Sequence, residues 1–161
     1  MKVLWAPWRM DYITASNEKG ECIFCSGDDR DHDEERLILH VGERSIVLMN
    51  RFPYINGHLL VAPVRHVSAL NALANEEKLD LITMVERSIG ILAEVMNPGG
   101  FNVGLNLGHI AGAGVEEHIH FHVVPRWSGD TNYMTVIGDV RVIPEHIQAT
   151  YLKLLPFFRN L

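Results

Sequence analysis

Short apolar runs separated by turn residues predict paired strands in the first half of this chain. Residues 45–50 (SIVLMN) and 58–62 (HLLVA) are typical of buried strands. The segment between them contains Pro53 and the turn pair Asn56-Gly57. These features predict an antiparallel hairpin. Two further strands are predicted over residues 101–105 and 119–125, on either side of the glycine-rich segment 108–114.

A long amphipathic helix is predicted over residues 76–96. Its apolar residues recur at intervals of three and four, which places them on one helical face. They are Leu79, Ile82, Val85, Ile89, Leu92 and Met96. Asn75 can cap the helix, and residues 97–100 (NPGG) are expected to end it.

A second helix is predicted near the C-terminus, over residues 145–155. Ile147, Tyr151 and Leu155 lie at helical spacing, and Pro156 is expected to end the helix. Strands paired as hairpins with helices between and after them predict an α+β fold. We expect a mostly antiparallel sheet of about five strands, with the 76–96 helix packed on it.

Length, charge and hydropathy narrow the class of protein. The 161 residues suggest one domain, and 14 basic against 20 acidic residues give a net charge of −6. This balance argues against sequence-independent nucleic-acid binding, although it leaves a small anionic ligand possible. There is no apolar run of the ~20 residues that span a bilayer, and residues 1–17 do not resemble a secretory signal. We therefore expect a cytoplasmic protein that does not enter a membrane.

Three histidines alternate with apolar residues in the segment 118–124 (HIHFHVV). In a strand His118, His120 and His122 would share one face, with their rings roughly 6.6 Å apart along the strand. A neutral imidazole is a nucleophile at pH 7, and a neighbouring one can supply a proton. Beside a glycine-rich loop, three such rings indicate phosphoryl chemistry. Two alternatives are a solvated polar face and three ligands of one metal ion.

The segment 118–124 closely resembles the signature of the histidine triad family. Residues 50–63 (NRFPYINGHLLVAP) resemble its nucleotide-binding hairpin, and residues 123–127 (VVPRW) the segment after its triad. The resemblance covers residues 20–128 of a single domain over residues 1–161. It leaves an N-terminal arm (1–20), which carries several aromatic residues, and a C-terminal extension (129–161).

Two further segments, residues 4–12 and 130–138, narrow the resemblance to one branch of the family. They are similar to the branch that contains the fragile histidine triad and diadenosine tetraphosphate phosphorylase proteins.

The resemblance implies a role for each matching residue. His120 would attack the α-phosphate and form a covalent nucleotidyl intermediate. His122 would hold that phosphate and assist the leaving group, and His58 would belong to the network behind the nucleophile. Asn50 would meet the ribose hydroxyls, and Asn106 would contact phosphate.

The residues just before the triad depart from the commonest family pattern. Many members have Gln-Ser or Gln-Thr where this chain has Ala113-Gly114-Val115. No hydroxyl or side-chain amide is therefore present there for the leaving phosphate. We expect the backbone N–H groups of Gly112, Ala113, Gly114 and Val115 to take that place.

The resemblance implies a homodimer that cleaves nucleoside polyphosphates at the α-phosphate, without magnesium. The substrate class would be dinucleoside polyphosphates such as diadenosine tetraphosphate. An adenosine phosphoramidase is an alternative within the family. A different alternative is a nucleotide-binding sensor with negligible turnover, which the absence of a hydroxyl at Gly114 would favour.

Cys22-Ile-Phe-Cys25 places two thiols at a spacing that suits one tetrahedral metal ion. With no second cysteine pair in the chain, histidines would have to complete the ligand set. By resemblance to zinc-carrying members of the family, His66 and His118 complete a structural zinc site. His32 and His40 lie nearer in sequence. The alternative is a pair of packed or redox-active cysteines without metal.

Overall fold

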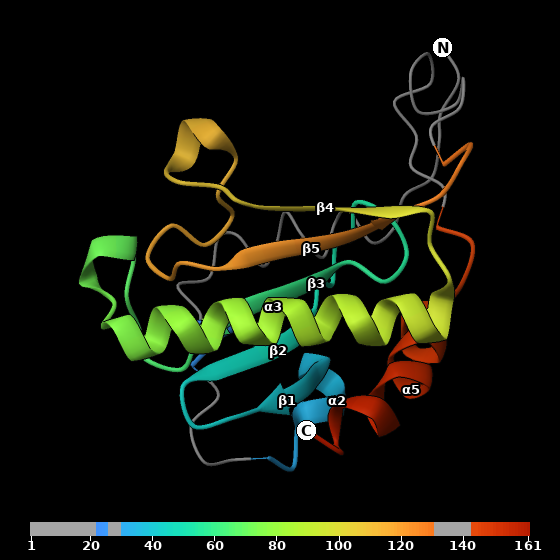
Figure 1. Cartoon of the computed structure of the whole chain (residues 1–161), viewed down its shortest axis with the longest axis horizontal. Helices are drawn as coiled ribbons and strands as arrows, with labels where there is room; N and C mark the ends of the chain where they lie inside the picture. Colours follow the sequence, from blue (N-terminus) through green and yellow to red (C-terminus); the bar gives the residue numbers. More distant parts are fainter. Residues whose placement is uncertain (1–21, 26–29, 131–142) are drawn as a thin grey trace.

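A five-stranded antiparallel sheet forms the centre of the computed structural model shown in Figure 1, which describes residues 22–25, 30–130 and 143–161. The strand order is β1-β2-β3-β5-β4. The strands are β1 (Ile38–Val41), β2 (Ser45–Met49), β3 (Leu59–Pro63), β4 (Gly100–Leu105) and β5 (Phe121–Arg126). The helices are α2 (Asp33–Arg36), α3 (Asn75–Met96) and α5 (Ile147–Phe158). The predicted α+β class and antiparallel sheet are confirmed.

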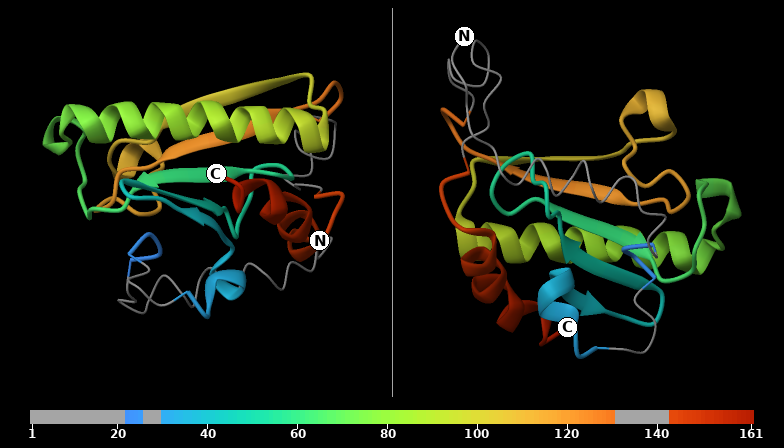
Figure 2. Two further views of the ribbon diagram at one scale, coloured as in Figure 1. Left: turned by 60° about the horizontal axis from the view of Figure 1, so that its bottom comes forward. Right: turned by 180° about the vertical axis from the view of Figure 1, so that it is seen from behind.

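The two faces of the sheet bury different apolar clusters. Because side chains alternate along a strand, Val47, Leu59 and Val61 pack on the α3 side together with residues of α5. Leu48 and Leu60 project to the other face, which Phe24 covers. In the left view of Figure 2, α3 and the short segment 22–25 lie on opposite sides of the sheet. The second face is the one that carries the functional side chains.

The buried face of α3 differs from the predicted one. Leu79 is 70% exposed and Ile82 is 54% exposed, so these two residues do not belong to the core. The buried residues are Leu81, Met84, Val85, Ser88, Ile91 and Leu92. This second series also recurs at intervals of three and four, and it shares Val85 and Leu92 with the predicted one. The side of α3 that packs on the sheet is therefore shifted around the helix from the predicted one, toward Leu81 and Met84.

The start of α3 and the end of α5 differ slightly from the prediction. Asn75 is the first residue of α3 rather than its cap, and the Glu77 carboxylate accepts a hydrogen bond of 2.7 Å from the Ala74 N–H. Pro156 does not end α5, which continues to Phe158. Proline has no N–H, so Pro156 leaves the carbonyl of Leu152, four residues earlier, without its helical donor. Leu152 is an exposed residue, which lessens the cost of that loss. Burial of Phe158 favours the extra turn.

Some expected segments lie wholly or partly outside the described residues. These are the N-terminal arm, with Trp5 and Trp8, and residues 131–138. Of the residues that follow Cys25, those from residue 30 onward are described, and they include α2, a single helical turn with no buried residue. Within the described ranges, α3 and α5 are each too short or too polar to cross a membrane.

Candidate active site and metal centre

The three alternating histidines gather on the sheet face opposite α3. Only His122 lies within β5, where it pairs with Leu60 of β3. His118 and His120 precede the strand, which begins at Phe121 rather than at residue 119. The reason is that the Ile119 N–H donates to Val67 O (2.7 Å), so this stretch is fixed to the loop after β3.

His120 is held so that one ring nitrogen keeps a free lone pair. Its Nδ1 lies 2.8 Å from the carbonyl oxygen of His118, which can only accept, so Nδ1 carries the proton. Nε2 is then unprotonated in the neutral ring. The residue is only 6% exposed, and this burial lowers the pKa of His120 from its ordinary value. A neutral imidazole with a free Nε2 is the form that can attack phosphorus.

A chain of hydrogen bonds fixes the protonation of the other two histidines. The Tyr54 N–H donates to His58 Nδ1 (3.1 Å), so His58 carries its proton on Nε2. That nitrogen donates to His122 Nδ1 at 2.9 Å. Neutral His122 therefore carries its own proton on Nε2. Burial, and then the charge of His120, lower the pKa of His122 to about 4.

Asn106 lies between His122 and the glycine-rich segment 108–114. Its Nδ2 donates to Gly112 O (3.3 Å). The same Nδ2 lies 3.3 Å from His122 Nε2, but both groups are donors, so they are neighbours and not hydrogen-bond partners. Gly108 and Gly112 have φ angles of +84° and +86°, a region that side chains disfavour. The end of this loop is thereby placed beside the proton-carrying nitrogen of His122.

Two of the four backbone amides expected to meet phosphate are used within the loop. Gly112 N–H donates to His109 O (2.9 Å), and Ala113 N–H donates to Gly108 O (3.3 Å). Among the described backbone groups, the N–H groups of Gly114 and Val115 have no such partner. Of the four backbone N–H groups predicted to contact phosphate, those of Gly114 and Val115 therefore remain as candidates.

The turn between β2 and β3 packs against the histidine pair. Asn50 Oδ1 accepts from the Phe52 N–H (2.9 Å), and Asn50 Nδ2 lies 3.3 Å from His58 Nδ1. The Tyr54 ring lies 4.6 Å from the His58 ring and is stacked at 5.7 Å on that of His122. Sequence reasoning did not select Tyr54; an aromatic residue within the turn was its only signal.

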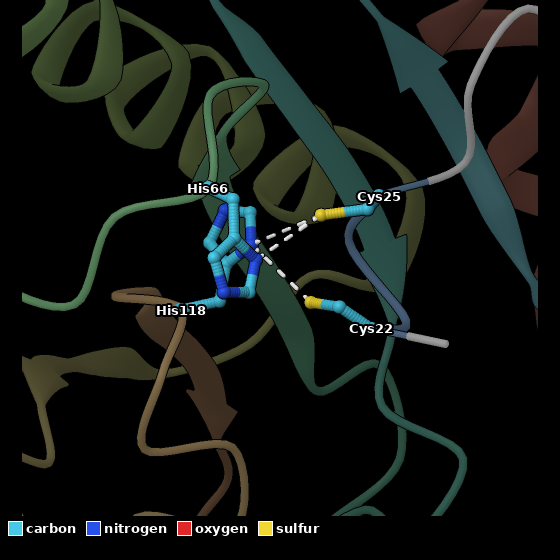
Figure 3. Close-up of side chains that lie close together, drawn as sticks. All are labelled: Cys22, Cys25, His66 and His118. Carbon is cyan, nitrogen blue, oxygen red and sulfur yellow. Dashed lines mark hydrogen bonds between the residues drawn. The ribbon is translucent and has the colours of Figure 1, made fainter. Parts of the chain in front are cut away.

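Four side chains on three separate segments form a compact ligand cluster (Figure 3). The ligand atoms of Cys22, Cys25, His66 and His118 lie within 4.8 Å of one another. Cys22 Sγ is 3.3 Å from His118 Nδ1, and Cys25 Sγ is 3.2 Å from His66 Nδ1. Zinc bonds of about 2.0–2.3 Å place tetrahedral donors roughly 3.3–3.8 Å apart, so these residues fit a zinc ion.

The surroundings of this cluster favour metal binding. His118 Nε2 donates to Pro63 O (2.8 Å), which leaves the Nδ1 lone pair directed at the sulfur atoms. Burial, and then the neighbouring Cys22, raise the pKa of Cys25 to about 11. A divalent cation reverses this effect, because a coordinating thiol loses its proton. His118 therefore belongs to the cluster through its ring and supports His120 through its carbonyl.

Local contacts explain how the three segments meet. The Cys25 N–H donates to Cys22 O, which closes a turn around Phe24. The Phe24 ring, which sequence reasoning missed, lies 5.0 Å from His118 and 4.9 Å from His120. Beside His66, the Arg65 guanidinium binds both carboxylate oxygens of Glu77 on α3.

His32 and His40 are not brought to the cysteines. His40 lies on β1 and donates from Nδ1 to Phe158 O (3.2 Å), whereas His32 precedes α2. Neither residue belongs to the cluster of potential ligands found among the described residues.

Comparison with known proteins places this geometry among relatives. The model of the HIT domain matches residues 32–129, which is more than half of the chain. An AP-4-A phosphorylase of Mycobacterium tuberculosis is 39% identical over 154 residues, covering 91% of this chain and 79% of that protein. A bis(5'-adenosyl)-triphosphatase of Dictyostelium discoideum is 36% identical over 89 residues, covering 55% of this chain and 59% of that protein.

A solved structure has the same fold. The Zn-bound histidine triad family protein of Mycobacterium smegmatis superposes with a TM-score of 0.65 at 23% identity. The match covers 87% of this chain and 94% of that one.

Proposed function

Because this chain belongs to the HIT domain family, we propose that it is a nucleotidyl hydrolase or phosphorylase that acts on dinucleoside polyphosphates such as diadenosine tetraphosphate. The names of the two relatives support this substrate class. The observation that carries the proposal is the hydrogen bond from His120 Nδ1 to His118 O, because it leaves Nε2 free as a nucleophile.

The proposed reaction has two displacements. In the first, the lone pair of His120 Nε2 forms a bond to the α-phosphorus while the bond from phosphorus to the bridging oxygen of the leaving group breaks. The leaving phosphate chain departs as an anion that accepts a hydrogen bond from His122 Nε2–H, so His122 keeps its proton. In the second, water or inorganic phosphate attacks the same phosphorus, the bond to His120 breaks and restores its neutral imidazole, and the proton of the attacking group passes to solvent.

The surrounding groups support the charge that develops on the phosphate. The N–H groups of Gly114 and Val115 are available to the non-bridging oxygens. So is the second hydrogen of the Asn106 NH2 group, whose first hydrogen is donated to Gly112 O. Donors aimed at the site in advance need no reorganisation during the reaction. These groups take the part that magnesium has in kinases, so no magnesium is required. Asn50, beside His58, would receive the ribose hydroxyls.

We also propose that Cys22, Cys25, His66 and His118 hold a structural zinc ion. The donor distances support it, and so does the zinc bound by the similar Mycobacterium smegmatis protein. Four protein ligands close the coordination sphere, so the ion would supply a cross-link between three segments rather than a reactive position. Thiolate ligands persist in a reducing compartment, which supports a cytoplasmic location.

A homodimer is proposed for the single domain. Leu79 and Ile82 expose large apolar side chains on α3, and Val103 does so on β4, which is an edge strand. Exposed apolar side chains and an unpaired strand edge are each typical of a surface that a second subunit covers.

The covalent intermediate gives the most direct test. The protein is mixed with diadenosine tetraphosphate, quenched in acid-free denaturant, and its intact mass is measured. We expect a mass increase of one adenylyl group in the wild-type protein and none in His120→Ala, with nucleotide binding retained in the variant. The exposed His109→Ala is the matched control and should still form the adduct.

Binding and rate measurements on the same proteins separate the alternative functions. Binding without an adduct or turnover would support a nucleotide sensor. Faster turnover of an adenosine phosphoramidate than of diadenosine tetraphosphate would support a phosphoramidase. Acceleration by inorganic phosphate would distinguish a phosphorylase from a hydrolase. Turnover by His120→Ala at the wild-type rate would contradict the nucleophile assignment.

A further inference from the structure

A small polar cluster joins the turn between β2 and β3 to the C-terminal part of the chain. Asn56 of the turn is 7% exposed, and Thr150, in the first turn of α5, is completely buried. The Thr150 hydroxyl lies 2.9 Å from Asn56 Oδ1 and 2.8 Å from Glu145 Oε2. Asn56 Nδ2 lies 3.5 Å from the same carboxylate oxygen. The three side chains thus form a closed triangle of hydrogen-bonding groups.

The carboxylate in this cluster is held in its charged form. Glu145 is paired with Lys153, one helical turn beyond Thr150, and this pairing followed by the Thr150 hydroxyl lowers the pKa of Glu145. Hydrogen bonds to an ionised acceptor are stronger than those between neutral groups. A buried donor left without its acceptor would be costly, so the arrangement specifies one position for Asn56.

Asn56 lies two residues from both Tyr54 and His58, the residues whose hydrogen bonds set which nitrogen of His122 carries the proton. Tyr54 gives its N–H to His58 Nδ1, and its ring is stacked on His122. Between Asn56 and His58, Gly57 has a φ of +76°, and a Cβ there would lie 2.6 Å from Met96 Sδ of α3. The turn is therefore tightly packed on one side and hydrogen-bonded to α5 on the other.

We propose that Asn56, Thr150 and Glu145 are positioning residues, through which α5 holds the turn so that the Tyr54 N–H stays on His58 Nδ1. That N–H, together with Asn50 Nδ2 at 3.3 Å from the same nitrogen, selects the His58 tautomer. By placing the N–H, the cluster helps to set whether His58 Nε2 donates a hydrogen bond to His122 Nδ1. Glu145 and Thr150 lie beyond residues 32–129, so this part of the chain adds a support from outside the matched HIT domain. The catalytic consequence rests on the function proposed above.

Three variants of α5 test the cluster. Thr150→Val removes the hydroxyl and keeps the shape, whereas Thr150→Ser keeps the hydroxyl. Tyr151→Phe is the matched control, because it removes a neighbouring buried hydroxyl of the same helix that donates to Ile38 O (3.0 Å) on β1. A fourth variant, Glu145→Gln, alters the half-buried carboxylate that precedes α5, and it also keeps the test decisive if Thr150→Val does not fold.

Two measurements are made on each variant. The first is the ¹⁵N chemical shifts of the His58 ring nitrogens, which distinguish a protonated from an unprotonated nitrogen without any substrate. The second is the rate of adenylyl transfer to the protein in a single turnover, together with KM. In Thr150→Val we expect the His58 shifts to move toward averaged values. We expect the transfer rate to fall about tenfold with KM nearly unchanged.

Thr150→Ser should restore both measurements, and Tyr151→Phe should change neither even if it lowers the melting temperature. Wild-type His58 shifts in both Thr150→Val and Glu145→Gln would overturn the proposal. So would an equal effect of Tyr151→Phe, since the cluster would then only dock the helix. If none of the proteins forms an adduct, the proposed function fails, while the ¹⁵N shifts still decide whether the cluster positions His58.

Discussion

His58 and His122 share a hydrogen bond of 2.9 Å from Nε2 to Nδ1, although 64 residues separate them. The bond has a direction, because the Tyr54 N–H occupies His58 Nδ1 and leaves the proton on Nε2. It therefore fixes which nitrogen of His122 carries the proton. The N–H of His122 that is proposed to donate a hydrogen bond to the leaving group is set by a residue that need not touch the substrate.

The first prediction concerns the Nε2–H group of His58, which donates to His122 Nδ1. The variant His58→Leu removes this donor and leaves His122 Nδ1 without a hydrogen-bond partner. We expect kcat for diadenosine tetraphosphate to fall about 10–100-fold, as for other groups that orient a functional histidine. The free energy of unfolding should fall by about 1–3 kcal/mol. Steady-state kinetics and urea unfolding measure the two effects.

The matched variant is His58→Gln, whose amide nitrogen can reach the place of Nε2 and still donate. It should keep more of kcat than His58→Leu. Equal activity in the two variants would mean that the ring fills space and that the direction of the hydrogen bond is unimportant.

The second prediction is a dependence of stability on pH. The pKa of His122 is about 4 in the folded protein, against 6.5 for a histidine in its ordinary state, because of burial and then the charge of His120. Between these two values the unfolded chain binds a proton that the folded protein does not. The stability due to His122 is therefore complete above about pH 6.5 and is lost as the pH falls toward 4.

Urea unfolding at several pH values between 8 and 5 measures this dependence. Other buried histidines contribute to the slope, so the comparison is with His122→Asn, which keeps them and the metal cluster. The variant should show a shallower loss of stability on acidification. Parallel curves for the two proteins would contradict the assigned pKa of His122.

The third prediction concerns the metal. Cys22→Ser should reduce bound zinc from about one ion per chain to nearly none and lower the melting temperature, because a structural site contributes folding free energy directly. Elemental analysis of untagged protein and thermal unfolding provide the measurements. His32→Ala is the control, since His32 lies outside the cluster. Zinc-free wild-type protein together with an unchanged melting temperature in Cys22→Ser would refute the site.

Local spacing carried most of the information about the functional residues. The alternation of His118, His120 and His122 identified the face they share, even though two of them precede β5. The two-residue gap between Cys22 and Cys25 identified the turn that brings both sulfur atoms together. Such patterns are readable because they depend on the geometry of a few consecutive residues.

Features that depend on competition between distant parts of the chain were not predictable. Two apolar series on α3 overlap at Val85 and Leu92, and only packing against the sheet selects the one without Leu79. About five strands were expected, but the position of β1 was not identified, since it directly follows an acidic segment. The contact between Asn56 and Thr150 joins residues 94 positions apart and has no local signal in either segment.

The last prediction concerns the missing hydroxyl before the triad. Gly114 does not have a positive φ, and a Cβ built on it would meet no atom within 4 Å among the described residues. A serine can therefore be accommodated there without strain, unlike at Gly112, where φ is +86°. If Gly114 lies beside the leaving phosphate, its new hydroxyl would add a donor to the transition state. One such hydrogen bond is worth about 0.5–1.5 kcal/mol, or a rate increase of roughly twofold to tenfold.

Gly114→Ser should thus raise kcat/KM for diadenosine tetraphosphate within that range, while Gly114→Ala, which adds the Cβ alone, should not. The increase should be smaller for an adenosine phosphoramidate, because its leaving group has no phosphate to accept the hydrogen bond. Equal changes for both substrates would place the loop away from the leaving group. A loss of activity in both Gly114→Ser and Gly114→Ala would show instead that a ligand requires the space next to the backbone. The amides of residues 114 and 115 would then approach the phosphate more closely than a side chain permits.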